Sequence, residues 1–117
     1  MSDKKGWIAV DFDGTLALFA GNFTVMGAPI PRMVQRVRQW LRDGYEVRIF
    51  TARIAHKDPV KRQAVIDAIQ EWCVTHIGVK LEVTNVKDFN MVQMYDDKAV
   101  QVIKNTGWII TMRGIKR

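Results

Sequence analysis

The stretch Ile-Ala-Val-Asp-Phe-Asp-Gly-Thr-Leu, residues 8–16, contains the pattern that decides the fold. An apolar run ends at two carboxylates, Asp11 and Asp13, and Gly14 then lets the chain turn. Side chains two positions apart on an extended backbone point the same way, so both carboxylates should face one small volume beyond a strand end. A buried carboxylate pair needs a cation or a proton to offset its repulsion. The stretch therefore predicts an acidic site suited to Mg²⁺-dependent phosphoryl transfer.

Outward from this strand, apolar runs alternate with segments of helical periodicity, which predicts an α/β fold with a mainly parallel sheet. We expect a single domain over residues 1–117, built as a Rossmann-like three-layer sandwich around a five-stranded sheet. The expected strands are residues 7–10, 45–50, 81–84, 91–95 and 108–111. The expected helices run from Pro31 to a stop at Asp43-Gly44, from Pro59 to a stop at Gly78, and over 98–103.

Residues 16–29 fit neither period. Two apolar arms flank Gly21-Asn22, which is a hairpin turn signal. We expect a small β-hairpin flap projecting from the sheet end that carries Asp11 and Asp13. Exposed apolar residues of this kind often mark interfaces, so the flap is a candidate contact for a second subunit in a homo-oligomer.

The composition is that of an ordinary globular chain with a basic excess. Its 18 lysines and arginines outnumber 12 acids, giving a net charge of +6, concentrated over residues 32–62 and in the tail 113–117. This charge fits either a solvated helix face with a frayed end or a surface for nucleic acid. No apolar run or signal peptide suggests membrane association. Cys73 is the only cysteine, so an internal disulfide is excluded and we expect a cytoplasmic protein. Cys73 shares an apolar helix face with Ile69, so we expect its thiol to be buried and inert.

Polar side chains follow three of the expected strands. Asp11 and Asp13 end the first, Thr51 ends the second, and Asp96 and Asp97 end the fourth. Sites in parallel α/β sheets form outside the carboxyl ends of strands, so these residues should converge.

The same residues resemble the four signatures of the haloacid dehalogenase superfamily. Asp11-Phe12-Asp13-Gly14-Thr15, Thr51 behind a strand, a later lysine and Asp96-Asp97 occur in the family's order over residues 7–97. The resemblance implies a phosphatase in which Asp11 is the nucleophile and forms an aspartyl-phosphate. Asp13 would protonate the leaving alcohol and then deprotonate the attacking water.

The resemblance also implies a ligand set. Mg²⁺ would be held by Asp11, the main-chain carbonyl of Asp13 and Asp96, while Asp97 would hold a metal-bound water or orient a lysine. Thr51 would donate to a phosphoryl oxygen. Gly14, Thr15 and Ala52 would complete the phosphate pocket.

The site also needs positive charge to offset the phosphate of the substrate. Two positions are considered: the signature lysine, and an arginine that could bind phosphate oxygens. We assign the signature lysine to Lys87, which follows the third strand, rather than to Lys80, which precedes it. Thr51-Ala52-Arg53 resembles the hydroxyl-x-arginine arrangement in phosphatase domains of polynucleotide end-processing enzymes. Arg53 could bind phosphate oxygens, or it could pair with a surface acid.

The chain resembles a minimal, capless member of the superfamily, because fifteen residues separate Thr15 from Pro31. An open site admits the phosphate of a small molecule or of a nucleic-acid end. We expect a Mg²⁺-dependent phosphomonoester hydrolase. The alternatives are a nucleic-acid 3′-end phosphatase and a non-enzymatic, receiver-like module that carries a phosphoaspartate.

Overall fold

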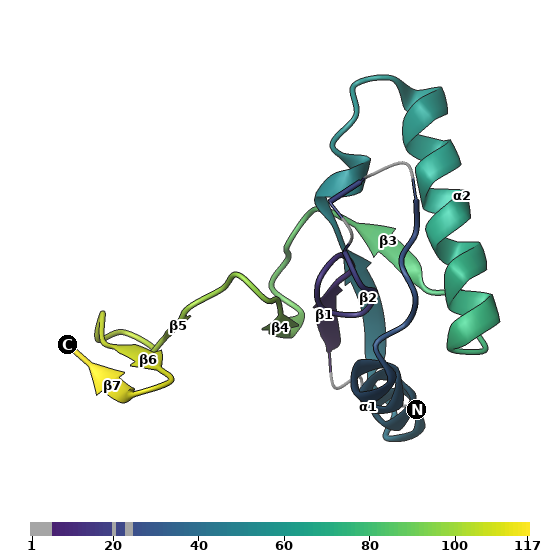
Figure 1. Cartoon of the computed structure of the whole chain (residues 1–117). Helices are drawn as coiled ribbons and strands as arrows, with labels where there is room; N and C mark the ends of the chain where they lie inside the picture. The colour runs from purple at the N-terminus through teal and green to yellow at the C-terminus, as the bar shows by residue number, and fades with distance from the viewer. Residues whose placement is uncertain (1–5, 20, 23–24) are drawn as a thin grey trace.

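The computed structural model describes residues 6–19, 21–22 and 25–117, and its body is a four-stranded parallel sheet (Figure 1). The strand order is β3-β2-β1-β4. The strands are β1 (Trp7–Asp11), β2 (Glu46–Phe50), β3 (Glu82–Thr84) and β4 (Met91–Tyr95). Asp11 pairs with Phe50, Phe50 with Thr84, and Val10 with Tyr95, so the strands end level with one another. This rim is where the polar residues of the sequence pattern gather.

Two helices connect these strands and pack on the same face of the sheet. They are α1 (Pro31–Arg42) and α2 (Pro59–His76), and both begin at the proline that the sequence indicates. Arg38 of α1 donates to the carbonyls of His76 (2.9 Å) and Ile77 (3.2 Å), which brings α1 against the C-terminal end of α2. Two successive right-handed crossovers in one direction put both helices on one face.

The core fills the space between that face and the helices. Ile8, Val10, Val47 and Ile49 alternate along β1 and β2 and form one buried cluster with residues of α1 and α2. Each side chain of this kind contributes about 1.5–3 kcal/mol when fully buried. The central strand β1 is thus held rigidly, and with it the position of Asp11.

The predicted α/β fold with a mainly parallel, Rossmann-like sheet is confirmed, but the sheet has four strands rather than the expected five. The helix layer expected on its second face is not found among the described residues. Residues 98–103 do not form a helix, and among the described residues the helices cover one face of the sheet. The segment contains β5 (Gln101–Val102), which pairs antiparallel with β6 (Ile109–Thr111); β6 in turn pairs with β7 (Gly114–Lys116). This small sheet stands apart from the body (Figure 1, yellow).

Side-chain shape and loop length explain why the C-terminal segment forms its own antiparallel sheet rather than a helix and a fifth parallel strand. Val100, Val102 and Ile103 are β-branched, and this stiffness disfavours a helix and favours a strand. Hairpins with short loops also cost little closure entropy, whereas pairing 108–111 with the distant parallel sheet requires a long crossover. Gly114 supplies the positive φ (111°) that the β6–β7 turn requires.

The base of the expected flap is a pair of antiparallel arms. Ala17 bridges Pro29, and the Leu18 amide donates to the Ala28 carbonyl (2.8 Å). The turn predicted around Gly21-Asn22 involves residues 20, 23 and 24, which lie outside the described part of the chain. Gly27 crosses close over the other arm, where a Cβ would lie 1.7 Å from the Leu18 carbonyl oxygen.

Two further features bear on the sequence predictions. In the part of the chain that the structure describes, no helix has the length and apolar character needed to span a bilayer. Cys73 is buried as expected, and burial raises the pKa of its thiol to about 12.

Candidate active site

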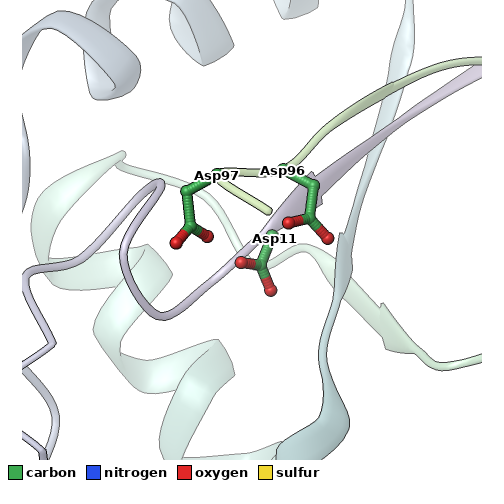
Figure 2. Close-up of side chains that lie close together, drawn as sticks. All are labelled: Asp11, Asp96 and Asp97. Atoms are coloured by element: carbon green, nitrogen blue, oxygen red, sulfur yellow. The ribbon is translucent and has the colours of Figure 1, made fainter. Parts of the chain in front are cut away.

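Three carboxylates from opposite ends of the chain meet at the rim of the sheet. Asp11 ends β1, and Asp96 and Asp97 directly follow the neighbouring strand β4. One oxygen from each carboxylate lies within 4.8 Å of the others, and the three side chains converge (Figure 2). The parallel pairing of β1 with β4 produces this convergence, since both strands end at the same edge.

The crowding of these charges shows in their protonation. Burial raises the pKa of Asp11 to about 7, and a hydrogen bond with Asp97 and the charges of Asp96 and Asp97 add to this effect. The same hydrogen bond lowers the pKa of Asp97. A proton taken up by this pair is therefore held on Asp11 rather than on Asp97. A divalent cation at this position would replace that proton.

Gly14 and Thr15 hold Asp97 against the turn after β1. The Thr15 hydroxyl accepts a hydrogen bond from the Asp97 amide (3.0 Å) and donates to the Asp97 carboxylate (3.1 Å). Gly14 has φ of 84°, and a Cβ there would lie 2.8 Å from an Asp97 carboxylate oxygen. These residues, expected to touch substrate, position an acid in the structure; substrate contact by either stays a prediction.

Asp13 and Arg53 form a bidentate ion pair. The Arg53 Nε lies 2.7 Å from one carboxylate oxygen of Asp13, and Nη2 lies 2.8 Å from the other. Nη2 also donates to the Val25 carbonyl (2.9 Å), and Arg53 is only 8% exposed. Of the two interpretations of Arg53, pairing with an acid is the one observed, but the acid is Asp13 rather than a surface group. The fork geometry fixes the orientation of the Asp13 carboxylate.

Thr51 caps the short 3-10 turn η1 (Ala52–Ile54) that carries Arg53. Its hydroxyl accepts a hydrogen bond from the Arg53 amide (3.1 Å), and the residue is 2% exposed. A hydroxyl that accepts in this way retains its own proton. That proton is the group that would reach a phosphoryl oxygen, as the sequence predicts.

The acidic residues of the site and Thr51 line one cavity of about 290 Å³, whereas Thr15 and Arg53 are not among its described lining residues. Its described lining consists of Asp11, Asp13, Gly14, Phe19, Phe50, Thr51, Ala52, Asp96, Asp97 and Lys98. Seven of these ten are site residues that the sequence predicts, and the other three are Phe19, Phe50 and Lys98.

Lys98 is the one basic residue among the described lining residues of this cavity, and Lys87 is not among them. The neighbour of Lys87, Asp88, accepts a hydrogen bond from Trp7 Nε1 (2.8 Å), and Trp7 begins β1 at the end opposite Asp11. The Lys98 amide instead donates to the Asp96 carboxylate (2.8 Å), and the charge of Lys98 contributes to lowering the pKa of Asp97. Its position directly after the acidic pair is the signal that would have found it.

Comparison with known proteins bears on the fold. No protein-family model matches the chain, and no curated protein matches it. One solved structure, described as the conserved protein coded by a locus from Bacteroides thetaiotaomicron, is similar with a TM-score of 0.60 and 19% identity. The match covers 80% of this chain and 77% of that chain. At this identity the likeness shows a shared α/β fold.

Proposed function

We propose that this protein is a Mg²⁺-dependent phosphomonoester hydrolase of the haloacid dehalogenase type, with Asp11 as its nucleophile. The observation that carries the proposal is the meeting of Asp11, Asp96 and Asp97 at one strand-end rim, with Asp13 and Thr51 lining the same cavity. One carboxylate to attack, a second to move protons and a polar cradle are the parts that this chemistry requires.

The donor set fits magnesium. The three converging side chains offer carboxylate oxygens alone, which are the ligands that a hard divalent cation prefers. Asp11, Asp96 and Asp97 would hold the ion, together with the main-chain carbonyl of Asp13 that the resemblance implies. The bound ion would offset the repulsion between a carboxylate and a phosphate dianion.

Asp11 attacks phosphorus in its ionised form, so a proton held on Asp11 must leave before the first step. The Thr51 hydroxyl donates to a phosphoryl oxygen, and Lys98 supplies a positive charge at the cavity wall. Positioning and electrostatics of this kind account for most of the catalysis in phosphoryl transfer. Lys87 as the signature lysine stays a prediction.

Asp13 takes up a proton from solvent when substrate binds and gives it to the leaving oxygen as the P–O bond of the ester breaks. It then takes a proton from the water that attacks the aspartyl-phosphate. Both of its oxygens are held by Arg53, at 2.7 and 2.8 Å. One oxygen must therefore release the guanidinium before it can carry a proton to the leaving oxygen. Because the pair is bidentate, the second contact keeps the carboxylate in place during that exchange.

The test is phosphate release from a panel of phosphomonoesters with Mg²⁺ and with a chelator. We expect turnover that needs the metal and is abolished by Asp11→Asn, which keeps the size of the side chain and removes its charge. Asp67→Asn, an exposed carboxylate on α2, is the matched control and should retain full activity. Turnover surviving in Asp11→Asn would contradict the proposal, and a long-lived phosphoaspartate without turnover would favour the signalling module.

A second candidate, removal of a 3′-phosphate from a nucleic-acid end, is favoured by the basic segment that follows the acidic pair in the sequence. Residues 98–117, which follow the acidic pair, contain five lysines and arginines and no acid. Hydrolysis of a 3′-phosphorylated oligonucleotide that weakens steeply with salt would support this substrate. Equal, salt-insensitive rates on the oligonucleotide and on small phosphomonoesters would exclude it.

A further inference from the structure

A second cavity, of about 490 Å³, adjoins the acidic one and is not used by the chemistry above. It lies between the flap arm, η1 and α2. Its apolar described lining is Met26, Ala52, Ala55, Ala64, Val65 and Ala68. We call this cavity the alanine hollow. Its volume is within the range of pockets that take small organic ligands, about 300–1,000 Å³.

The alanine hollow is joined to the acidic cavity through two residues. Ala52 lines both cavities. Arg53 lines the hollow, while its guanidinium holds Asp13, which lines the acidic cavity. The Asp13–Arg53 ion pair therefore stands at the boundary between them, with the three converging carboxylates on one side and the hollow on the other.

This placement determines where a leaving group would go. A general acid must lie within hydrogen-bonding reach of the oxygen that it protonates, so the leaving oxygen sits at Asp13. The remainder of the alcohol then extends away from phosphorus and past Asp13. The hollow lies beyond the Asp13–Arg53 pair, next to the acidic cavity, and can receive that part of the substrate.

We infer that the alanine hollow binds the alcohol portion of the substrate, and that this alcohol carries one flat aromatic group. The inference rests on the proposed function and specifies its substrate class. Four alanine methyl groups, with Met26 and Val65, offer an aromatic ring apolar contact. The hydroxyls of a sugar would lose their water there without gaining partners from these side chains.

The polar groups of the hollow agree with an uncharged alcohol. The guanidinium of Arg53 is already matched by Asp13, at 2.7 Å, so its charge is compensated before substrate arrives. The other polar residue in the described lining is His56, which is exposed. A substrate with a second phosphate would find no uncompensated lysine or arginine among the described lining residues.

The test compares 2-phenylethyl phosphate with ethyl phosphate, whose leaving alcohols have similar acidity. We expect kcat/KM to be about ten-fold or more higher for the aromatic substrate, because burial of a ring's apolar surface supplies binding of this order. Ala68→Leu fills the hollow and should bring the ratio of the two kcat/KM values toward one. Ala64→Leu is the second such variant; leucine is a strong helix former, so α2 should be retained.

A control and a binding measurement separate this inference from the proposed function. Val74→Leu enlarges an exposed apolar side chain on α2 outside the described lining of the hollow, and should leave the ratio unchanged. Calorimetry with 2-phenylethylphosphonate and ethylphosphonate, which are not hydrolysed, should show the same preference and the same loss in Ala68→Leu. Tighter binding of the aromatic phosphonate, with no hydrolysis of either phosphate ester, would contradict the proposed function and leave this inference standing. Equal affinities, or a preference that both leucine variants retain, would overturn the inference.

Discussion

Asp11→Asn should stabilise the metal-free protein while abolishing its activity. In the folded chain the pKa of Asp11 is raised from 3.8 to about 7, chiefly by burial and by the neighbouring acids. Above pH 7 Asp11 is ionised in both the folded and the unfolded state. Its buried charge then lowers the free energy of unfolding by the full amount. As the pH falls below 7 the folded protein takes up a proton that the unfolded chain does not, and the cost disappears. Asparagine has no charge at any pH, and its amide can still donate to Asp97.

The magnitude follows from the shift. Three pKa units correspond to about 4 kcal/mol as an upper bound. Asp11 is only half-buried and the pKa of Asp97 moves the opposite way, so solvent screening and this compensation leave about 1–2 kcal/mol. For a domain of this size that corresponds to a rise in Tm of roughly 3–8 °C.

The assay is thermal unfolding with a chelator at pH 8 and at pH 5. At pH 8 Asp11→Asn should melt above the wild type, and at pH 5 the difference should shrink because the wild-type carboxyl is already protonated. Mg²⁺ should raise the Tm of the wild type at pH 8 and have a smaller effect on the variant. Asp67→Asn controls for the loss of a carboxylate elsewhere. A variant that melts at or below the wild type at pH 8, or a gain that is independent of pH, would refute the reasoning.

Three further predictions concern the flap, the ion pair and the C-terminal sheet. Gly27→Ala should lower the free energy of unfolding by about 2 kcal/mol or more, because the new Cβ would lie 1.7 Å from the Leu18 carbonyl oxygen. Urea denaturation measures this change. An unchanged denaturation midpoint would contradict the close approach of the two arms. Arg53→Met should destabilise the protein by about 1–3 kcal/mol, because it leaves the Asp13 carboxylate unpaired. Adding Asp13→Asn to this variant should recover part of the lost stability. A double variant no more stable than Arg53→Met would argue against the ion pair. Amides of β1 and β2 should exchange with solvent far more slowly than those of β5–β7, because the former are covered by helices; equal protection would show that the small sheet is covered too.

The sequence by itself determined the elements that depend on local pattern. The apolar run before Asp11, the prolines at the starts of α1 and α2, and the strand before Asp96 were all located correctly, because periodicity and capping are read from neighbouring residues. The meeting of Asp11 with Asp96 and Asp97 was also predictable, since parallel strands end at one rim.

The tertiary structure decided which side chains face one another and which strands pair. The pairing of Asp13 with Arg53, forty positions apart, depends on how η1 is turned against the flap, and no local pattern specifies that angle. Lys98 rather than Lys87 is among the described residues that line the cavity, since the loop that follows Lys87 returns to the start of β1, where Asp88 accepts a hydrogen bond from Trp7. The separate β5–β7 sheet arises because a strand takes the partner that costs least to reach, and here that partner is local. An alternation of apolar and polar residues predicts a strand. The sheet that this strand joins depends on which neighbouring strands are available to pair with it in the folded chain.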